Sequence, residues 1–330
     1  MPTPRISHVT PACTTPGGRI TLHGSDFPVG LSRPDVRVGD EPARVVFASS
    51  SELGVVVSAA TSGTQPVRVA GEETGATVQV AVPIANGLHQ VDSPAVDRFR
   101  TIYLTYSGTR GQQVPVSLFR LPYGGGRESF SSNVTNPTSL AIGPDEALYV
   151  SSRFEGAVYK MDPDGNGEVF ATDLGIACGL AFGPDGTLFV GDRSGTVFEV
   201  STGGRARTMA TLPSSVAAFH LALGNDGLYV TAPTLSARDG VYRITFGGEV
   251  SLVQSGFGRP QGLAFSPAGD LYVVDALAGV SGLYRVVDGR APELIVSGPR
   301  LVGLAFDEDD MILCSGDTAY RLPQPPAHEG

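Results

Sequence analysis

A histidine stands where parallel segments of this chain carry glycine. His220 aligns with Gly179, Gly262 and Gly303 when segments of roughly forty residues are superposed. Because the pKa of imidazole lies near neutrality, a histidine here can act as a general base or contact a ligand. The alternative is structural, with the imidazole filling space on the axis of the repeats or bonding a backbone carbonyl. We keep His220 as a candidate ligand-binding residue, together with Gln261 of the next repeat.

Arginines recur near every repeat, in the loops expected on one face of the molecule. The six are Arg110, Arg153, Arg193, Arg238, Arg259 and Arg300. Guanidinium forks match carboxylate and phosphate groups, and loops on rigid scaffolds commonly bind ligands. These arginines therefore predict a site for an anionic small molecule or an acidic peptide near His220 and Gln261. The alternative is a solvated surface on which Glu155, Asp239 and Asp317 pair with the arginines.

One segment matches much of an EF-hand calcium loop. Its candidate ligands are Asp162, Asp164, Asn166 and, at the twelfth position, Asp173. A strand-like segment precedes them where an EF-hand has a helix, and the sister repeats carry ordinary turns at this place. We favour an Asp/Gly hairpin turn and keep the calcium loop as a weak alternative. We expect no other metal or cofactor.

A repeated framework positions these residues. Five segments are led by Leu140, Leu180, Leu221, Leu263 and Leu304, with spacings of 40, 41, 42 and 41 residues. A weaker sixth copy precedes them at residues 95–104. Each copy contains four short strand patterns separated by Gly-rich or Asp/Gly turns. This pattern predicts a β-propeller, because each blade has two apolar faces that only neighbouring blades can cover.

The repeats predict a six-bladed propeller over residues 85–324, followed by a tail at 325–330. The last repeat ends after its third strand, at residues 319–322. Residues 87–91 have strand character and stand just before the first blade. We expect this segment to complete the last blade and close the ring, which would remove exposed sheet edges.

Residues 1–84 do not follow the repeat. About seven short strand patterns with tight turns predict a small β-sandwich, so the fold class is all-β. The formal net charge of −10 argues against a duplex nucleic-acid partner. Cys13, Cys178 and Cys314 contain no CxxC spacing and are expected to be reduced and buried.

Targeting signals are weak in this sequence. Its apolar runs fall short of the roughly 20 residues that span a bilayer, and its first residues lack the apolar core of a signal peptide. We expect no transmembrane segment. The compartment is unknown: cytoplasmic is the default, and secreted applies if a signal has been trimmed.

Both parts resemble known families. The series Ile6…Val9…Pro11, Pro16-Gly-Gly-x-Ile20-Thr-Leu22-x-Gly24-x-x-Phe27 and Val36-x-Val38-Gly39 resembles the immunoglobulin-like IPT/TIG domain, over about 80 residues. The motif from Pro260 to Asp275 resembles NHL-type repeats and gluconolactonase-like six-bladed propellers. With its sister repeats, this resemblance covers about 240 residues. These propellers include lactonases, lyases and binding modules, so the resemblance is specific for fold and poor for function.

The gluconolactonase resemblance implies a central divalent cation held by Glu, Asn and Asp. In the register of the innermost strands, the corresponding residues are Thr138, Cys178, Phe219, Gln261 and Val302. This set contains no carboxylate, and one amide with one hydroxyl would hold a hard cation weakly. We therefore expect the enzyme's metal site to be missing from these positions.

The sequence favours a binding or interaction module whose partner is an unknown anionic small molecule or a protein. A metal-dependent lactonase or esterase is the first alternative, with ligands supplied from unaligned positions, and a structural assembly module is the second. The catalytic residues of such an enzyme are unknown from the sequence. A bound divalent cation in the channel would distinguish the enzyme from the binding module.

Overall fold

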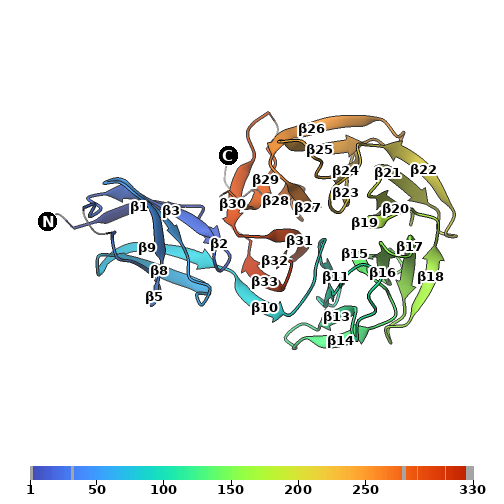
Figure 1. Ribbon diagram of the computed structural model, residues 1–330, viewed down its shortest axis with the longest axis horizontal. Coiled ribbons are helices and arrows are strands. Elements are labelled where there is room, and N and C mark those ends of the chain that lie inside the picture. The colour runs from blue at the N-terminus through green and yellow to red at the C-terminus, as the bar shows by residue number, and fades with distance from the viewer. Residues whose placement is uncertain (1–2, 31–32, 277–279, 288, 309, 325–330) are drawn as a thin grey trace.

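The structure is a computed structural model that describes residues 3–30, 33–276, 280–287, 289–308 and 310–324. The predicted tail at 325–330 lies outside these residues. Every regular element within the described ranges is a β-strand, so the all-β expectation is confirmed. Among these residues, no helix offers the length and apolarity needed to cross a membrane. Figure 1 shows a sandwich at the N-terminal side and a ring of sheets beyond it.

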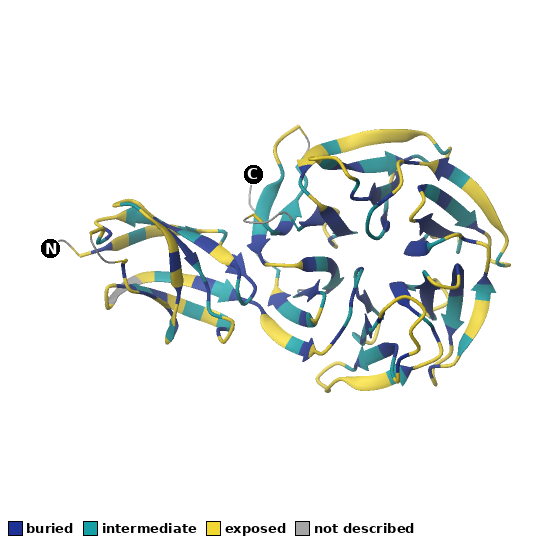
Figure 2. Cartoon of the chain, viewed as in Figure 1, coloured by how far each residue is buried: buried dark blue, intermediate teal, exposed yellow. Residues whose placement is uncertain are grey.

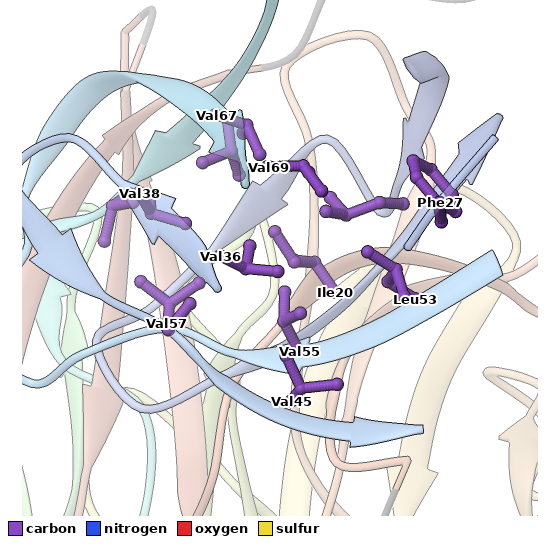
Figure 3. Packing of buried hydrophobic residues seen from close by; sticks show 14 residues of the cluster. Ile20, Phe27, Val36, Val38, Val45, Leu53, Val55, Val57, Val67 and Val69 are labelled. Atoms are coloured by element: carbon purple, nitrogen blue, oxygen red, sulfur yellow. The ribbon is translucent and has the colours of Figure 1, made fainter. Parts of the chain in front are cut away.

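The sandwich consists of two sheets whose apolar side chains face each other. One sheet has the order β1 (Arg5–Thr10), β3 (Arg19–Ser25), β7 (Glu52–Val56) and β6 (Arg44–Ala48). The other contains β2 (Cys13–Thr14), β9 (Glu72–Val80), β8 (Gly63–Val69), β4 (Val36–Val38) and β5 (Glu41–Pro42). Alternating residues such as Ile20, Leu22, Val36 and Val38 are almost fully buried between the sheets (Figure 3).

Four-stranded antiparallel sheets follow, which we number in chain order. Sheet 1 contains β11 (Ala95–Val96), β12 (Ile102–Thr105), β13 (Leu118–Leu121) and β14 (Glu128–Ser131). Sheet 2 contains β15 (Pro137–Ile142), β16 (Leu148–Ser152), β17 (Ala157–Met161) and β18 (Gly167–Ala171). Sheet 3 contains β19 (Ala177–Phe182), β20 (Leu188–Asp192), β21 (Thr196–Val200) and β22 (Ala206–Thr211). The weak first repeat is therefore confirmed as strands.

The remaining sheets repeat the same order. Sheet 4 contains β23 (His220–Gly224), β24 (Gly227–Thr231), β25 (Asp239–Ile244) and β26 (Val250–Phe257). Sheet 5 contains β27 (Pro260–Phe265), β28 (Leu271–Asp275), β29 (Gly282–Arg285) and β30 (Glu293–Ser297). Sheet 6 contains β31 (Leu301–Asp307), β32 (Asp310–Ser315), β33 (Thr318–Pro323) and β10 (Val82–Asn86).

Burial falls from the inner to the outer strands of these sheets. All residues of β16, β20 and β28 are buried, whereas most of β26 is exposed. Figure 2 shows the exposed strands at the rim of the ring. A strand buried on both faces needs neighbouring sheets on either side, which explains why the repeats stand side by side around one axis.

Sheet 6 combines strands from the two ends of the repeat region, but its outer strand differs from the prediction. The expected strand was 87–91, whereas β10 pairs with β33 through Val82 opposite Arg321 and Asn86 opposite Thr318. Gly87 has a φ of 68°, in the left-handed region that interrupts a strand. The N–H groups of Leu88 and Gln90 instead donate to the turn carbonyls at residues 317 and 316.

The sandwich and sheet 5 share one nine-stranded sheet. The short strand β2 pairs in parallel with β9 on one side and with β30 on the other. The buried Thr14 hydroxyl donates to the Ser297 carbonyl at 3.0 Å, and the Ser297 hydroxyl donates to the Thr14 hydroxyl at 2.8 Å. The Thr15 N–H also donates to the Ser297 carbonyl, at 2.8 Å. Continuous backbone pairing therefore joins the two units.

Candidate functional site

A cavity of about 270 Å³ lies where the inner ends of the sheets meet. Each of Thr138, Cys178, Gln261 and Val302 is the second residue of its innermost strand, and all four line the cavity. The other lining residues lie before sheets 1 and 4 and in the loops of sheets 2 and 3: Gln90, Val91, Arg153, Ile176, Arg193, Val216, Ala217 and Ala218. Segments from all six repeats converge only at their common axis, so we call this space the axial cavity.

Two arginines bring positive charge to the axial cavity. Arg153 follows β16 and donates from Nη2 to the Gly108 carbonyl at 3.2 Å. Arg193 follows β20 and is held through Nε and Nη2 by the carbonyls of Ser215 and Val216, at 3.2 and 3.1 Å. These contacts use neutral carbonyl acceptors. They orient both guanidinium groups without neutralising them.

The arginines also repel one another. Burial lowers the pKa of Arg153, and the positive charges of Arg193 and Arg110 lower it further, against an opposing effect of Cys178. Among the described residues, none of the six predicted arginines takes part in an ion pair. Arg153 and Arg193 therefore bring positive charge to the axial cavity without an ion-pair partner, while the charges of Asp92 and Asp192 act on the lining residue Cys178.

The acids expected to pair with these arginines have other partners. Glu155 accepts from the Tyr159 hydroxyl at 2.6 Å, Asp239 accepts from the Thr234 hydroxyl at 2.7 Å, and Asp317 accepts from the Ser315 hydroxyl at 2.9 Å. Their hydrogen bonds stay within their own loops and sheets. The alternative of a self-neutralised arginine surface thus finds no ion pair within the described part of the chain.

On the opposite face, carboxylates and cations do pair. Asp145 contacts Lys160 at 2.7 Å, and Asp226 contacts Arg243 in the equivalent place of sheet 4. The repeats place an acid in the first turn and a base on the third strand, so these pairs recur as a structural device. Within the described part of the chain, Arg153 and Arg193 on the arginine face make no such pair.

The other predicted arginines lie away from the axial cavity. Arg238 donates to the Gly256 carbonyl at 2.9 Å beside a separate groove of sheet 4. Arg259 and Arg300 are exposed in the connections before β27 and β31. Arg110 is exposed in the loop after β12 and acts on Arg153 through its charge. The structure thus brings Arg153, Arg193 and Gln261 together.

His220 lies at the axis but is buried rather than presented to solvent. Its Nδ1 stands 2.6 Å from Oδ1 of Asp92, which also accepts from the Ser93 N–H at 2.7 Å. The imidazole is 0% exposed and the Asp92 residue 4% exposed. This pair joins the segment before sheet 1 to the first strand of sheet 4, next to the axial cavity. Among the residues that the structure describes, His220 Nε2 has no hydrogen-bond partner.

Sequence reasoning missed Asp92, although a signal was present. The first repeat is offset by 46 residues from the second, and applying that offset to Thr138 gives Asp92. The five clear repeats contribute one equivalent residue each to a ring of residues around the axis, and none of the five is a carboxylate: Thr138, Cys178, Phe219, Gln261 and Val302. The structure makes Asp92 the sixth member of that ring.

Two further cavity features had no sequence signal. The buried Gln90 amide interacts with the Cys314 thiol and has no other hydrogen-bond partner within the described part of the chain. The pKa of His89 is lowered by burial and by the charge of Arg153, which makes His89 an electrostatic neighbour of the site. Strand pattern alone does not show which side chains meet in space.

The ring does not fit the cation set implied by the gluconolactonase resemblance. Asp92 is its single carboxylate, and that group is already bonded to His220. The remaining members offer one hydroxyl, one thiol, one amide and two apolar side chains: Thr138, Cys178, Gln261, Phe219 and Val302. Hard divalent cations require several oxygen ligands, and burial raises the pKa of the Cys178 thiol to about 11. Among the described residues, no group of three potential His, Cys, Asp or Glu ligands is brought together.

The calcium-loop candidate forms a turn in the structure. Asp162 accepts from the backbone N–H groups of Asp164 and Asn166 and from the Asn166 side chain, at 2.8–2.9 Å. Asp173 lies beyond β18 and bonds Thr172 at 3.1 Å. The Asp162 carboxylate is therefore used to cap its own hairpin.

One family model matches the N-terminal part of the chain. Residues 4–82 match the family model of the IPT/TIG domain, which covers the sandwich. A comparison with curated proteins found no matching sequence.

Solved structures of propeller-type proteins resemble between three quarters and nearly all of this chain in fold. A gluconolactonase from Xanthomonas campestris has a TM-score of 0.62 at 16% identity, covering 89% of this chain and 99% of its own. A virginiamycin B lyase from Staphylococcus aureus has a TM-score of 0.55 at 13% identity, covering 74% and 98%. An auxiliary nutrient binding protein from Bacteroides ovatus has a TM-score of 0.55 at 13% identity, covering 98% and 99%. At these identities the similarity shows the fold alone.

Proposed function

We propose that this protein binds a small anionic molecule in the axial cavity of a closed six-bladed propeller. In this proposal the immunoglobulin-like unit comprises residues 1–84 and the propeller residues 85–324, with β10 crossing between them and completing sheet 6. Pairing of β10 with β33 supports closure, because it joins the first and last parts of the ring within one sheet.

The positive charge that Arg153 and Arg193 bring to the axial cavity is the observation that supports an anionic ligand. Both guanidinium groups line an enclosed space, are fixed by carbonyl acceptors and make no ion pair among the described residues. A bound anion would offset the repulsion that lowers the pKa of Arg153. The cavity size of about 270 Å³ favours a small molecule over an acidic peptide lying across the face.

Calorimetry with simple anions tests this proposal. We expect 4-methylpentanoate, succinate or inorganic phosphate to bind in low salt, and the neutral 4-methylpentanamide to bind at least about tenfold more weakly than its acid. Replacing both arginines, Arg153→Met and Arg193→Met, should reduce anion affinity by about tenfold or more, because charged hydrogen bonds contribute about 1.5–3 kcal/mol each. Methionine retains the apolar stem, which limits the loss of packing.

A matched control separates the cavity from general surface charge. The variant Arg207→Met and Arg238→Met removes the same charge from exposed positions outside the axial cavity. Its anion affinity should stay close to that of the original chain. Equal losses in both double variants, or no binding of any anion to the original chain, would refute the proposal.

The hydrolase alternative rests on fold similarity to the gluconolactonase and lyase structures. It requires a divalent cation, whereas the ring contains the single carboxylate Asp92. Metal analysis of protein purified without chelator, followed by calcium titration, tests it directly. A stoichiometric ion that only a strong chelator removes would favour the hydrolase and call for a lactone hydrolysis assay.

A further inference from the structure

A second hollow adjoins the axial cavity on the side of sheet 4. It has a volume of about 630 Å³, and we call it the sheet-4 groove. Its apolar lining consists of Pro213, Val216, Leu235, Tyr242 and Leu252. Val216 lines the axial cavity as well. The two spaces therefore lie next to each other, and this one side chain contributes to both.

A fixed segment connects the arginines of the axial cavity to the groove. The carbonyls of Ser215 and Val216 hold Arg193, at 3.2 and 3.1 Å. On its other side, the segment bonds the Pro233 carbonyl through the Val216 N–H at 2.8 Å and the Ser215 hydroxyl at 3.0 Å. Pro233 precedes the loop that lines the groove. An anion bound to Arg193 would therefore lie beside the wall that both spaces share.

The groove gathers exposed leucines. Leu235, in the loop between β24 and β25, is 93% exposed, and Leu252, on β26, is 55% exposed. Within the described ranges, these are the two leucines that are exposed, and both line the same groove. A single exposed leucine is ordinary, but exposed apolar side chains gathered in one hollow indicate a binding surface.

Several polar groups of the groove already have protein partners. The Thr234 hydroxyl donates to Asp239 Oδ1 at 2.7 Å, and the Thr234 N–H donates to Asp239 Oδ2 at 3.0 Å. Arg238 donates to the Gly256 carbonyl at 2.9 Å. A peptide in the groove would bring backbone N–H and C=O groups that need partners of their own. An aliphatic chain needs none, so it suits the exposed leucines better.

We infer that the anionic ligand is an amphiphile, with a carboxylate or phosphate head and an unbranched aliphatic chain. This inference rests on the proposed anion-binding function. The head lies at Arg153 and Arg193 in the axial cavity. The chain passes Val216 and packs against Leu235 and Leu252 in the sheet-4 groove. Burial of the chain adds affinity that a short anion lacks.

A series of carboxylates measures the contribution of the chain by calorimetry. Hexanoate, octanoate and decanoate have the same head and differ in length. We expect decanoate to bind at least about tenfold more tightly than hexanoate, because each methylene removed from water tightens binding by up to about fourfold. Decanol lacks the anionic head and should bind at least about tenfold more weakly than decanoate. Decyl phosphate distinguishes the two heads: tighter binding than decanoate indicates a phosphate, and weaker binding indicates a carboxylate.

Variants of the exposed leucines link the chain to the groove. In the double variant Leu235→Ser and Leu252→Ser, the gain from hexanoate to decanoate should fall below about threefold, whereas the affinity for hexanoate should change little. The matched control is Val46→Ser with Val169→Ser, two exposed aliphatic positions on β6 and β18 that line neither space. This control should retain the whole gain.

An introduced tryptophan locates the chain directly. The sequence contains no tryptophan, so the emission of Leu235→Trp reports the groove alone. Decanoate should shift this emission to shorter wavelength, because its chain displaces water from the indole. Hexanoate should leave the emission unchanged, since its chain ends before Leu235. Phe246→Trp, at an exposed turn before β26 that does not line the groove, should respond to neither compound.

The outcomes separate the two proposals. Equal affinities for hexanoate and decanoate would overturn the amphiphile inference and leave the anion site standing. A chain-length gain that persists in the double serine variant, or decanol binding as tightly as decanoate, would also overturn it. Failure of decanoate, hexanoate, 4-methylpentanoate, succinate and phosphate alike would remove the anion-binding function together with the inference.

Discussion

At the scale of single residues, His89 couples the axial cavity to pH. Burial and the charge of Arg153 lower the pKa of His89 below its ordinary 6.5. An anion bound to Arg153 offsets part of that charge and raises the pKa of His89 again. Anion binding is therefore linked to proton uptake, so affinity should increase as the pH falls toward the ordinary histidine pKa.

Calorimetry with 4-methylpentanoate at about pH 8 and pH 6 should show several-fold tighter binding at the lower pH. In His89→Gln the affinity should be nearly independent of pH over this range, because the titrating group is gone. His8→Gln, in the sandwich, should retain the dependence. An original chain without any pH dependence would contradict the coupling.

The same lowered pKa affects the stability of the folded chain. The unfolded chain binds more protons than the folded chain between the folded pKa of His89 and 6.5. The contribution of neutral His89 is therefore present above pH 6.5 and is lost as the pH falls through the folded pKa. Bound anion should reduce this loss.

Residue types and register located part of the candidate site. The repeat register named Thr138, Cys178, Gln261 and Val302, and the structure brings these four side chains to one cavity. Asp92 escaped because its repeat has an irregular offset. The burial of the Gln90 amide beside Cys314 depends on contacts between distant segments, which spacing along the chain does not encode.

At the scale of elements, a carboxylate at the end of β31 joins two sheets. Asp307 is 1% exposed at its side chain and contacts Arg100, before β12, and Arg321, in β33, both at 2.7 Å. Burial alone would raise the pKa of Asp307, but hydrogen bonds from both arginines outweigh it and lower the pKa. The Asp307 carboxylate thus links sheets 6 and 1 through Arg100 and Arg321, an arrangement that we call the Asp307 clamp.

Asp307→Asn should lower the free energy of unfolding at neutral pH by about 1.5–3 kcal/mol, since it removes the charged acceptor of hydrogen bonds from two arginines, although Glu308 and Asp310 still contact Arg100 and Arg321. The cost stays below that of a fully buried pair because Arg100 and Arg321 are about a quarter exposed. Urea unfolding measures the difference. Glu128→Gln, which breaks an exposed pair with Arg120, should cost less than about 1 kcal/mol.

Acid should weaken the same clamp. The pKa of Asp307 is depressed, so its contribution is complete above the ordinary aspartate value of 3.8 and disappears as the pH falls through the folded pKa. The gap in stability between the original chain and Asp307→Asn should therefore narrow below about pH 4. A gap that persists in strong acid would show that packing, rather than charge, accounts for the loss.

Strand patterns predicted the elements better than their pairing. The four strands of each clear repeat follow from alternating apolar residues and Gly-rich turns, and these are local signals. The outer strand of sheet 6 lies five residues earlier than predicted, at β10. Strand character occurs on both sides of Gly87, and contact with β33 decides which side pairs.

At the scale of the whole molecule, β2 makes the sandwich and sheet 5 one continuous sheet. A Cβ added at Gly18 would stand 2.7 Å from the Ser297 carbonyl oxygen and would also meet the Thr14 hydroxyl. The glycine therefore permits the close approach of the two units where β2 pairs with β30, a junction that we call the seam. Sequence reasoning divided the chain by pattern and had no signal for the pairing of β2 with β30.

Gly18→Ala should lower the unfolding temperature by several degrees and separate unfolding of the two units, whereas the original chain should unfold in one transition. Differential scanning calorimetry measures both effects. Gly30→Ala is the matched control, because a Cβ there meets no described residue within 4 Å. Two resolved transitions in the original chain would contradict energetic coupling through the seam.

The seam also determines how force passes through the molecule. A pull on the N-terminal unit is carried by β2 into β30 as shear along parallel backbone hydrogen bonds, and by β10 directly into sheet 6. Because two segments attach it, the sandwich should transmit force to the sheets without rotating freely relative to them. When the sandwich binds another molecule, the opening of the axial cavity should therefore keep a constant direction relative to that molecule.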